Sequence, residues 1–282
     1  MTASAQMANA CRAGGDLRRA DEHFQYVHFL VRDQGVTDPL ALAQIDHLEG
    51  SLRKDQRRFQ EAEDLLARSA MLFQISGDAV ETARVLLKIG ELYFHRALLD
   101  RAIEMVEAAL ERLSPEEEPW LYLNGRHNLA LYLAEAGRHA QAAGLVAADE
   151  DLYRRIPEPW LQLRLSWLRG KIAAGLGEPA EAERLFRETR DGFVWQGNGY
   201  DAAMASLDLA LLYLREGRTA EVQPLAAEMV ALFESRDVHR EALAAVRLFQ
   251  EAAQREEVTA GVVREVAGRL EAARRSEAGE GQ

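Results

Sequence analysis

Histidine and cysteine, which often act in catalysis and metal binding, are sparse and scattered in this sequence. The histidines stand at positions 23, 28, 47, 95, 127, 139 and 239, and Cys11 is the only cysteine. No histidine belongs to a His-Glu-x-x-His pattern, and no Gly-x-Ser-x-Gly turn is present. Cys11 lies on an expected helix face that meets a partner helix, which predicts a buried, unreactive thiol. The sequence therefore predicts no enzyme activity, no metal site and no cofactor.

Two other segments could be taken for functional sites, but each is better explained by a structural role. Glu116-Glu117-Glu118 precedes an expected helix start, where acidic side chains complement the helix dipole. The glycine-rich segment 195–200 lacks the preceding strand and the following Lys-Ser/Thr of a phosphate-binding loop. We interpret the first as a helix cap and the second as a turn.

A column of basic and aromatic residues is the clearest binding signal. Its candidate residues come from the helix face opposite the packing residues: Lys54, Arg84, Lys88, Phe94, His127, Asn128, Arg164, Trp167, Lys171 and Arg215. Such a column in a chain of net charge −12 would favour an acidic peptide or another carboxylate-bearing ligand. Trp167 is the preferred anchor, because Trp and Arg are enriched at binding hot spots. The alternative is that the basic residues are merely solvated and that Trp167 belongs partly to the core.

A helical repeat with a period of about 40 residues would position this column. Small residues recur at Ala8, Gly50, Gly90, Ala130, Gly170 and Ala210. Twelve positions after them stand Ala20, Ala62, Ala102, Ala142, Ala182 and Val222, and a series in phase comprises Pro39, Ala79, Pro119, Pro159 and Gly199. We expect the small residues where the two helices of a hairpin cross, since larger side chains would separate them.

One repeat shows how each helical hairpin is built. Pro119 suits the first turn of a helix, and apolar residues follow at helical spacing as far as Leu133. Gly137 can adopt the left-handed conformation that ends the helix, and a second helix stops before Ile156. Other repeats carry a residue at the same turn position: Gly15, Arg57, Ala97, Gly177 and Gly217.

We predict an all-α fold, a right-handed α-solenoid of about six to seven helix-turn-helix repeats forming a single superhelical domain over residues 1–275. The expected repeats lie near 1–36, 37–77, 78–117, 118–157, 158–197 and 198–236, followed by a capping hairpin over 237–275 and a disordered tail over 276–282. The two helices of the capping hairpin are expected over 238–255 and 259–275, with Thr259 as the N-cap of the second.

The pattern resembles the tetratricopeptide repeat over roughly residues 7–235. The matching residues are Leu129-Ala130, Gly137 and Ala142 in one repeat, Ile89-Gly90, Tyr93, Ala102 and Ala109 in a second, and Leu209-Ala210, Tyr213 and Gly217 in a third. The period exceeds the usual 34 residues, and the surplus is best placed at the outer helix ends. HEAT-like repeats have about this length, but the phasing of small residue, glycine and alanine favours the tetratricopeptide type.

Long-period arrays of this type resemble the sensor arms of bacterial signal-transduction ATPases and transcriptional activators, and peptide-sensing regulators of Gram-positive bacteria. The uninterrupted array without a catalytic constellation predicts a non-catalytic interaction or scaffold module that holds a peptide or protein segment in a concave groove. The alternative is a ligand- or peptide-sensing domain of a bacterial signalling or transcriptional regulator. Asn9, Arg84 and Lys88 are similar to part of the carboxylate clamp of chaperone-binding tetratricopeptide domains, from which Ala5 and Leu48 depart.

Composition suggests where such a module would work. The N-terminal segment has no signal-peptide pattern, and no run approaches the ~20 apolar residues of a membrane span, which predicts a cytoplasmic protein. The acidic balance disfavours nucleic acid as a partner. Homodimerisation through the terminal repeats is a further hypothesis, because end repeats carry unpaired stacking surface.

Overall fold

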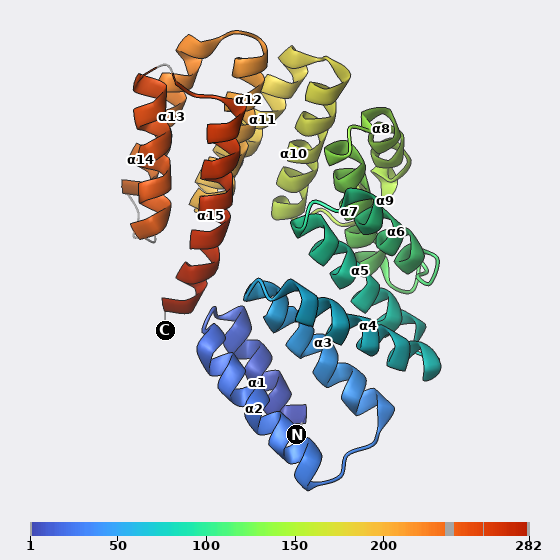
Figure 1. Cartoon of the computed structure of the whole chain (residues 1–282). Helices are drawn as coiled ribbons and strands as arrows, with labels where there is room; N and C mark the ends of the chain where they lie inside the picture. The colour runs from blue at the N-terminus through green and yellow to red at the C-terminus, as the bar shows by residue number, and fades with distance from the viewer. Residues whose placement is uncertain (1, 235–239, 256, 281–282) are drawn as a thin grey trace. The chain divides into compact units, whose positions relative to one another are not determined.

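The chain folds into successive α-helices in the computed structural model, which describes residues 2–234, 240–255 and 257–280 (Figure 1). No β-strand occurs in these ranges, so the all-α prediction is confirmed. The helices form two compact units, one comprising Met1–Tyr153 with Ala278–Gln282 and the other Arg154–Glu277. The single superhelical domain stays a prediction.

The first unit contains four helical hairpins that follow the expected repeats. Its helices are α1 (Thr2–Ala13), α2 (Leu17–Asp33), α3 (Pro39–Asp55), α4 (Phe59–Ile75), α5 (Ala79–His95), α6 (Leu99–Leu110), α7 (Pro119–Glu135), α8 (His139–Ala148) and α9 (Glu150–Arg155), the last of which ends just beyond the unit. The first helices of successive hairpins, α1, α3, α5 and α7, contact one another in that order. Of these helices, α3, α5 and α7 carry the predicted column in this unit.

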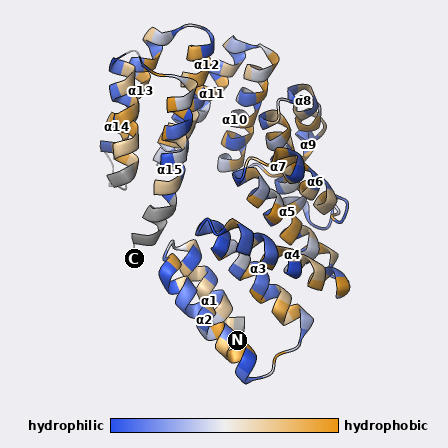
Figure 2. Cartoon of the chain, viewed as in Figure 1, coloured by the Kyte–Doolittle hydropathy of each residue, from blue (hydrophilic) through white to orange (hydrophobic). Residues whose placement is uncertain are grey.

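The second unit continues the same helical pattern. It contains α10 (Pro159–Leu176), α11 (Pro179–Trp195), α12 (Gly199–Arg215), the 3₁₀ turn η1 (Thr219–Glu221), α13 (Val222–Glu234), α14 (Arg240–Gln254) and α15 (Ala260–Glu280). A hydrophobic cluster of buried side chains in this unit includes Phe186, Phe233 and Phe249. Hydrophilic and hydrophobic residues alternate along the helices of Figure 2, as expected when each helix buries one face.

Small residues stand where the two helices of a hairpin approach each other. A Cβ atom on Gly50 would lie 2.8 Å from Leu66, and one on Gly90 would lie 2.9 Å from Val106. Gly170 is closer still, with 2.7 Å to the ring of Phe186. These separations are too short for a real Cβ contact, which supports the steric role that the sequence predicted.

A tyrosine–glutamate contact joins neighbouring hairpins in both units. Tyr93 on α5 donates its hydroxyl to Glu63 on α4 at 2.8 Å, and Arg96 pairs with the same carboxylate. In the second unit Tyr213 on α12 donates to Glu183 on α11 at 3.1 Å, and the guanidinium of Arg218 lies 2.6 Å from Glu183. Each glutamate thus fixes the second helix of one hairpin to the first helix of the next.

The turns within the hairpins adopt the left-handed conformation predicted for their glycines. Gly15, Gly137, Gly177 and Gly217 have φ of 83°, 76°, 79° and 71°. Arg57 and Ala97 occupy the same turn position with φ of 60° and 57°. A side chain with a Cβ atom is disfavoured there by roughly 1–2 kcal/mol, so these two turns are locally strained.

Replacing Ala97 by glycine is therefore expected to raise the free energy of unfolding by about 1 kcal/mol. The gain arises because glycine adopts the left-handed turn without steric cost. Urea-induced unfolding followed by circular dichroism would measure it. Ala136→Gly is the matched control, because Ala136 has φ of −78° and glycine there should only destabilise. Destabilisation of similar size by both substitutions would contradict the assignment of strain.

The structure modifies several predicted helix ends. The single second helix expected before Ile156 is divided into α8 and α9, with a turn at Asp149, whose carboxylate lies 2.7 Å from Arg126. Thr259 caps α15 as predicted, accepting a hydrogen bond from the Val262 amide at 3.3 Å. That helix continues through Glu280, so residues 276–280 of the predicted disordered tail are helical. Residues 238, 239, 281 and 282 lie outside the described ranges. None of the described helices is both long and apolar enough to cross a membrane.

Candidate binding surface

Four basic residues of the first unit gather on α1, α3 and α5, and we call Arg12, Lys54, Arg84 and Lys88 the basic cluster. Lys54 Nζ lies 2.6 Å from Glu91 Oε1, and Lys88 Nζ lies 3.1 Å from Glu91 Oε2. Arg12 joins α1 to α3 through Asp55 at 2.6 Å. Asp55 and Glu91 therefore link Arg12, Lys54 and Lys88 across three first helices, and Arg84 lies one turn before Lys88 on α5.

Arg84 and Lys88 are the accessible members of the basic cluster. They lie one helical turn apart on α5, and their side chains are 41% and 42% exposed. They pair with glutamates of the same helix, Glu81 at 3.0 Å and Glu91 at 3.1 Å. Because each side chain is about two-fifths exposed, both cations can also reach an incoming anionic group.

His47 is buried beside the basic cluster without a partner for one of its ring nitrogens. The residue is 7% exposed, and its buried Nδ1 atom makes no hydrogen bond among the described residues. Burial lowers the pKa of His47, and the charges of Lys88, Arg84 and Arg12 lower it further, to about 4. The imidazole is therefore neutral at pH 7, and a proton gained there would be favoured by an anion bound nearby.

Because the pKa of His47 is depressed in the folded state, the unfolded chain binds the extra proton between pH 6.5 and about 4. This residue should therefore destabilise the fold progressively as the pH falls through that window, by about 3 kcal/mol at pH 4. His47→Gln cannot be protonated and should reduce the slope of unfolding free energy against pH. Urea titrations at several pH values would measure this slope. His23→Gln is the control for loss of a histidine, and equal slopes in both variants would contradict the prediction.

An aromatic pair adjoins the basic residues on α5. Phe94 stacks on Tyr132 of α7, with ring centroids 4.6 Å apart and an interplanar angle of 17°. Phe94 is half-buried, and it stands three residues after Glu91, the partner of Lys88 on α5. On α7, Asn128 donates its side-chain amide to Asn124 at 3.0 Å in an exposed position. The first unit thus combines cations, an aromatic edge and an amide on neighbouring first helices.

Two predicted surface residues of this unit prove to be buried, and the structure corrects them. Lys54 is 7% exposed because its ammonium group is enclosed by Glu91 and lies 3.6 Å from Asp55. His127 is 4% exposed, and its Nδ1 atom lies 2.9 Å from the hydroxyl of Tyr153. Lys54 can support a binding surface through Glu91, whereas His127 is part of the interior.

In the second unit, the preferred anchor Trp167 makes intramolecular contacts. Its indole N–H donates to Asp208 Oδ2 at 2.7 Å, and its ring meets Phe193 edge-on at 5.9 Å. Lys171 pairs with the same carboxylate at 2.9 Å. These contacts support the alternative that Trp167 belongs partly to the core. Of the other two predicted residues, Arg164 lies over the Trp160 ring at 5.9 Å, and Arg215 is exposed at the end of α12.

The prediction missed a buried ionic network between α2 and α3. Arg53 of α3 pairs with Asp21 of α2 and, at 2.6 Å, with Glu49 of its own helix. Glu49 also lies 2.8 Å from His28 of α2, and this hydrogen bond raises the pKa of His28. Glu49 and Arg53 are 4% and 8% exposed. The sequence did hold a sign of this burial, because the equivalent positions two repeats later are occupied by Leu129 and Leu133.

Metal binding finds no support in the described part of the chain, where no group of three or more His, Cys, Asp or Glu side chains could hold an ion.

Comparison with known proteins identifies similar folds but no family. No protein-family model matches the chain, and no curated protein matches it. A Rap protein complexed with competence and sporulation factor has a TM-score of 0.65 and 15% identity, covering 97% of this chain and 87% of that chain. Aspartyl phosphate phosphatase F from Bacillus subtilis has a TM-score of 0.63 and 12% identity, covering 89% of this chain but only 63% of that one.

The apo form of RapI has a TM-score of 0.61 and 14% identity, covering 86% of this chain and 92% of that chain. At these identities the likeness shows the fold alone. The predicted all-α helical-repeat fold therefore agrees with the solved structures. The assignment to a long-period tetratricopeptide type stays a prediction.

Proposed function

We propose that this chain is a non-catalytic interaction module and that its first unit binds an acidic segment of a protein or peptide. The observation that carries this proposal is the pair of accessible cations, Arg84 and Lys88, on the same helix as the half-buried Phe94. An acidic side chain could share these cations, while an adjacent apolar side chain contacts the aromatic edge. Neutral His47 beneath them would accept a proton more readily once the anion is bound.

The solved structures of similar fold support binding rather than a particular ligand. One of them is a Rap protein complexed with competence and sporulation factor, so a chain of this fold can accommodate a bound factor. Another is named an aspartyl phosphate phosphatase, but 12% identity does not transfer that activity to this chain. The same similarity of fold also supports the second candidate function, a peptide-sensing domain of a bacterial signalling regulator.

Selection from a displayed peptide library would test the proposed surface directly. The wild-type protein should enrich acidic peptides, and Arg84→Glu/Lys88→Glu should abolish their retention. Arg255→Glu/Arg264→Glu reverses the same number of charges on two exposed residues, one just after α14 and one on α15, and should retain the peptides. Enrichment of basic or neutral peptides, or equal loss in both double variants, would contradict the proposal. Thermal unfolding of each variant would verify that it is folded.

Small-angle scattering with a selected peptide would then separate the two candidate functions. A scaffold should keep the same radius of gyration when the peptide binds. A sensor should become more compact or more extended, because its ligand must bind one conformation better than another.

A further inference from the structure

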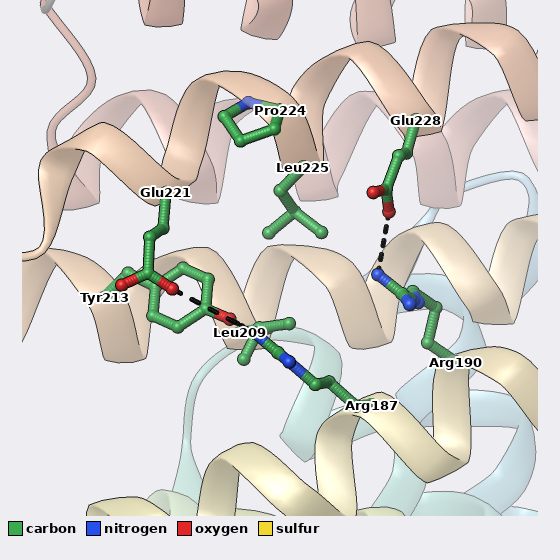
Figure 3. A pocket seen from close by; sticks show the side chains of 8 residues that line it. All are labelled: Arg187, Arg190, Leu209, Tyr213, Glu221, Pro224, Leu225 and Glu228. Atoms are coloured by element: carbon green, nitrogen blue, oxygen red, sulfur yellow. Dashed lines mark hydrogen bonds and ion pairs between the residues drawn. The ribbon is translucent and has the colours of Figure 1, made fainter.

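A small pocket of the second unit lies between charged walls of opposite sign. Its volume is about 200 Å³. Arg187 and Arg190 of α11 form one wall, and Glu221 of η1 with Glu228 of α13 forms the other (Figure 3). The remaining lining residues are the apolar Leu209, Leu225 and Pro224, with Tyr213. Pockets for drug-sized ligands measure roughly 300–1,000 Å³, so this one suits a smaller molecule.

One end of the pocket is held by a dense network. Arg187 donates to the Tyr213 hydroxyl at 2.7 Å and lies 2.8 Å from Glu183. Arg218 binds both oxygens of Glu221, each at 2.6 Å. Arg187 and Glu221 face each other at 3.9 Å. These contacts fix a cation and a carboxylate on opposite sides of the pocket before any ligand arrives.

The other end is closed by one ion pair. Arg190 and Glu228 point toward each other in Figure 3 and meet at 2.9 Å. The Glu228 side chain is 62% exposed, and Arg190 also lies 2.8 Å from Asp191. An exposed pair of this kind contributes little to stability, so a ligand that binds both partners can part them at small cost.

The two walls discriminate among ligand charges. A simple anion would be attracted by the arginines but repelled by Glu221 and Glu228. A simple cation would be attracted by the glutamates but repelled by the arginines. A ligand with both charges close together can satisfy both walls, and Leu209 and Leu225 can contact an aliphatic group between them. We propose that this pocket binds a free aliphatic α-amino acid, with its carboxylate on Arg187 and Arg190 and its ammonium group on Glu221 and Glu228.

L-Leucine is the probe for this proposal, used with the full chain in isothermal titration calorimetry. One molecule should bind per chain. Two analogues that each lack one charge, 4-methylpentanoate and isoamylamine, should bind about tenfold more weakly or worse, since each loses a hydrogen-bonded charge pair. Glycine should also bind more weakly, because it lacks the side chain that would contact Leu209 and Leu225.

Substitutions locate the site and keep the test independent of the peptide surface. Arg190→Gln and Glu228→Gln should each weaken L-leucine binding about tenfold. Arg184→Gln is the control on α11, because Arg184 pairs with Glu181 and Glu188 of its own helix. Absence of L-leucine binding, equal binding of either analogue, or equal affinity in all three variants would overturn the proposal. If calorimetry detects no binding, saturation-transfer NMR would show whether L-leucine binds too weakly for calorimetry to measure.

Discussion

Replacing Arg53 by alanine is expected to lower the free energy of unfolding by about 3–5 kcal/mol. The guanidinium group is enclosed between α2 and α3, where it pairs with Asp21 and with Glu49. Glu49 is only 4% exposed, so the substitution leaves a carboxylate that is poorly hydrated and has lost its guanidinium partner. Urea unfolding at pH 7 would measure the loss.

The double variant Glu49→Leu/Arg53→Leu tests the cause of that loss. It installs the residues that the chain itself carries two repeats later, Leu129 and Leu133. Replacing a buried ion pair by apolar residues is often neutral or stabilising, so the double variant should be at least as stable as the wild type. A double variant as unstable as Arg53→Ala would show that the apolar pair cannot fill the space.

Gly170→Leu should cost about 3 kcal/mol, the second-largest effect that we expect. A Cβ atom at this position would lie 2.7 Å from Cε1 and 2.8 Å from Cδ1 of Phe186, a ring that is itself 2% exposed. The side chain cannot be accommodated without moving α10 away from α11. Thermal and urea unfolding would both report the change.

The complementary experiment enlarges Gly170 after the opposing ring has been removed. Gly170→Ala should stabilise the Phe186→Val variant by up to about 1 kcal/mol, because alanine has the higher helix propensity and now has room. The equivalent positions one repeat earlier hold the same combination of alanine and valine, at Ala130 and Val146. In the wild-type background the substitution should destabilise. The same sign in both backgrounds would contradict a steric origin.

Much of the fold was predictable because its signals are local. Pro39, Pro119 and Pro159 begin α3, α7 and α10, as their fixed φ suggests. Gly137 closes its turn through the positive φ expected of it. The break between α8 and α9 was not predicted from the sequence, and it occurs at Asp149, whose carboxylate pairs with Arg126 of another helix.

The candidate site was predicted less well for a related reason. The sequence placed three polar or amphipathic residues on the exposed side of their helices, but each has a partner on a different helix. Lys54 pairs with Glu91, His127 contacts Tyr153, and Trp167 donates to Asp208. A single sequence does not show which distant residue meets a given side chain. Arg84 and Lys88 stay accessible because their glutamate partners lie on their own helix.

The tyrosine–glutamate contacts between hairpins restrict how an array of this kind can change in length. Glu63 meets Tyr93 and Glu183 meets Tyr213, each pair being separated by 30 residues along the chain. If a complete hairpin is inserted or lost between these two pairs, each glutamate remains 30 residues before its tyrosine. A shorter insertion within a pair separates the two partners and shifts the following hairpin relative to the preceding one. Length can therefore vary in whole-hairpin steps while the contacts between neighbours are retained.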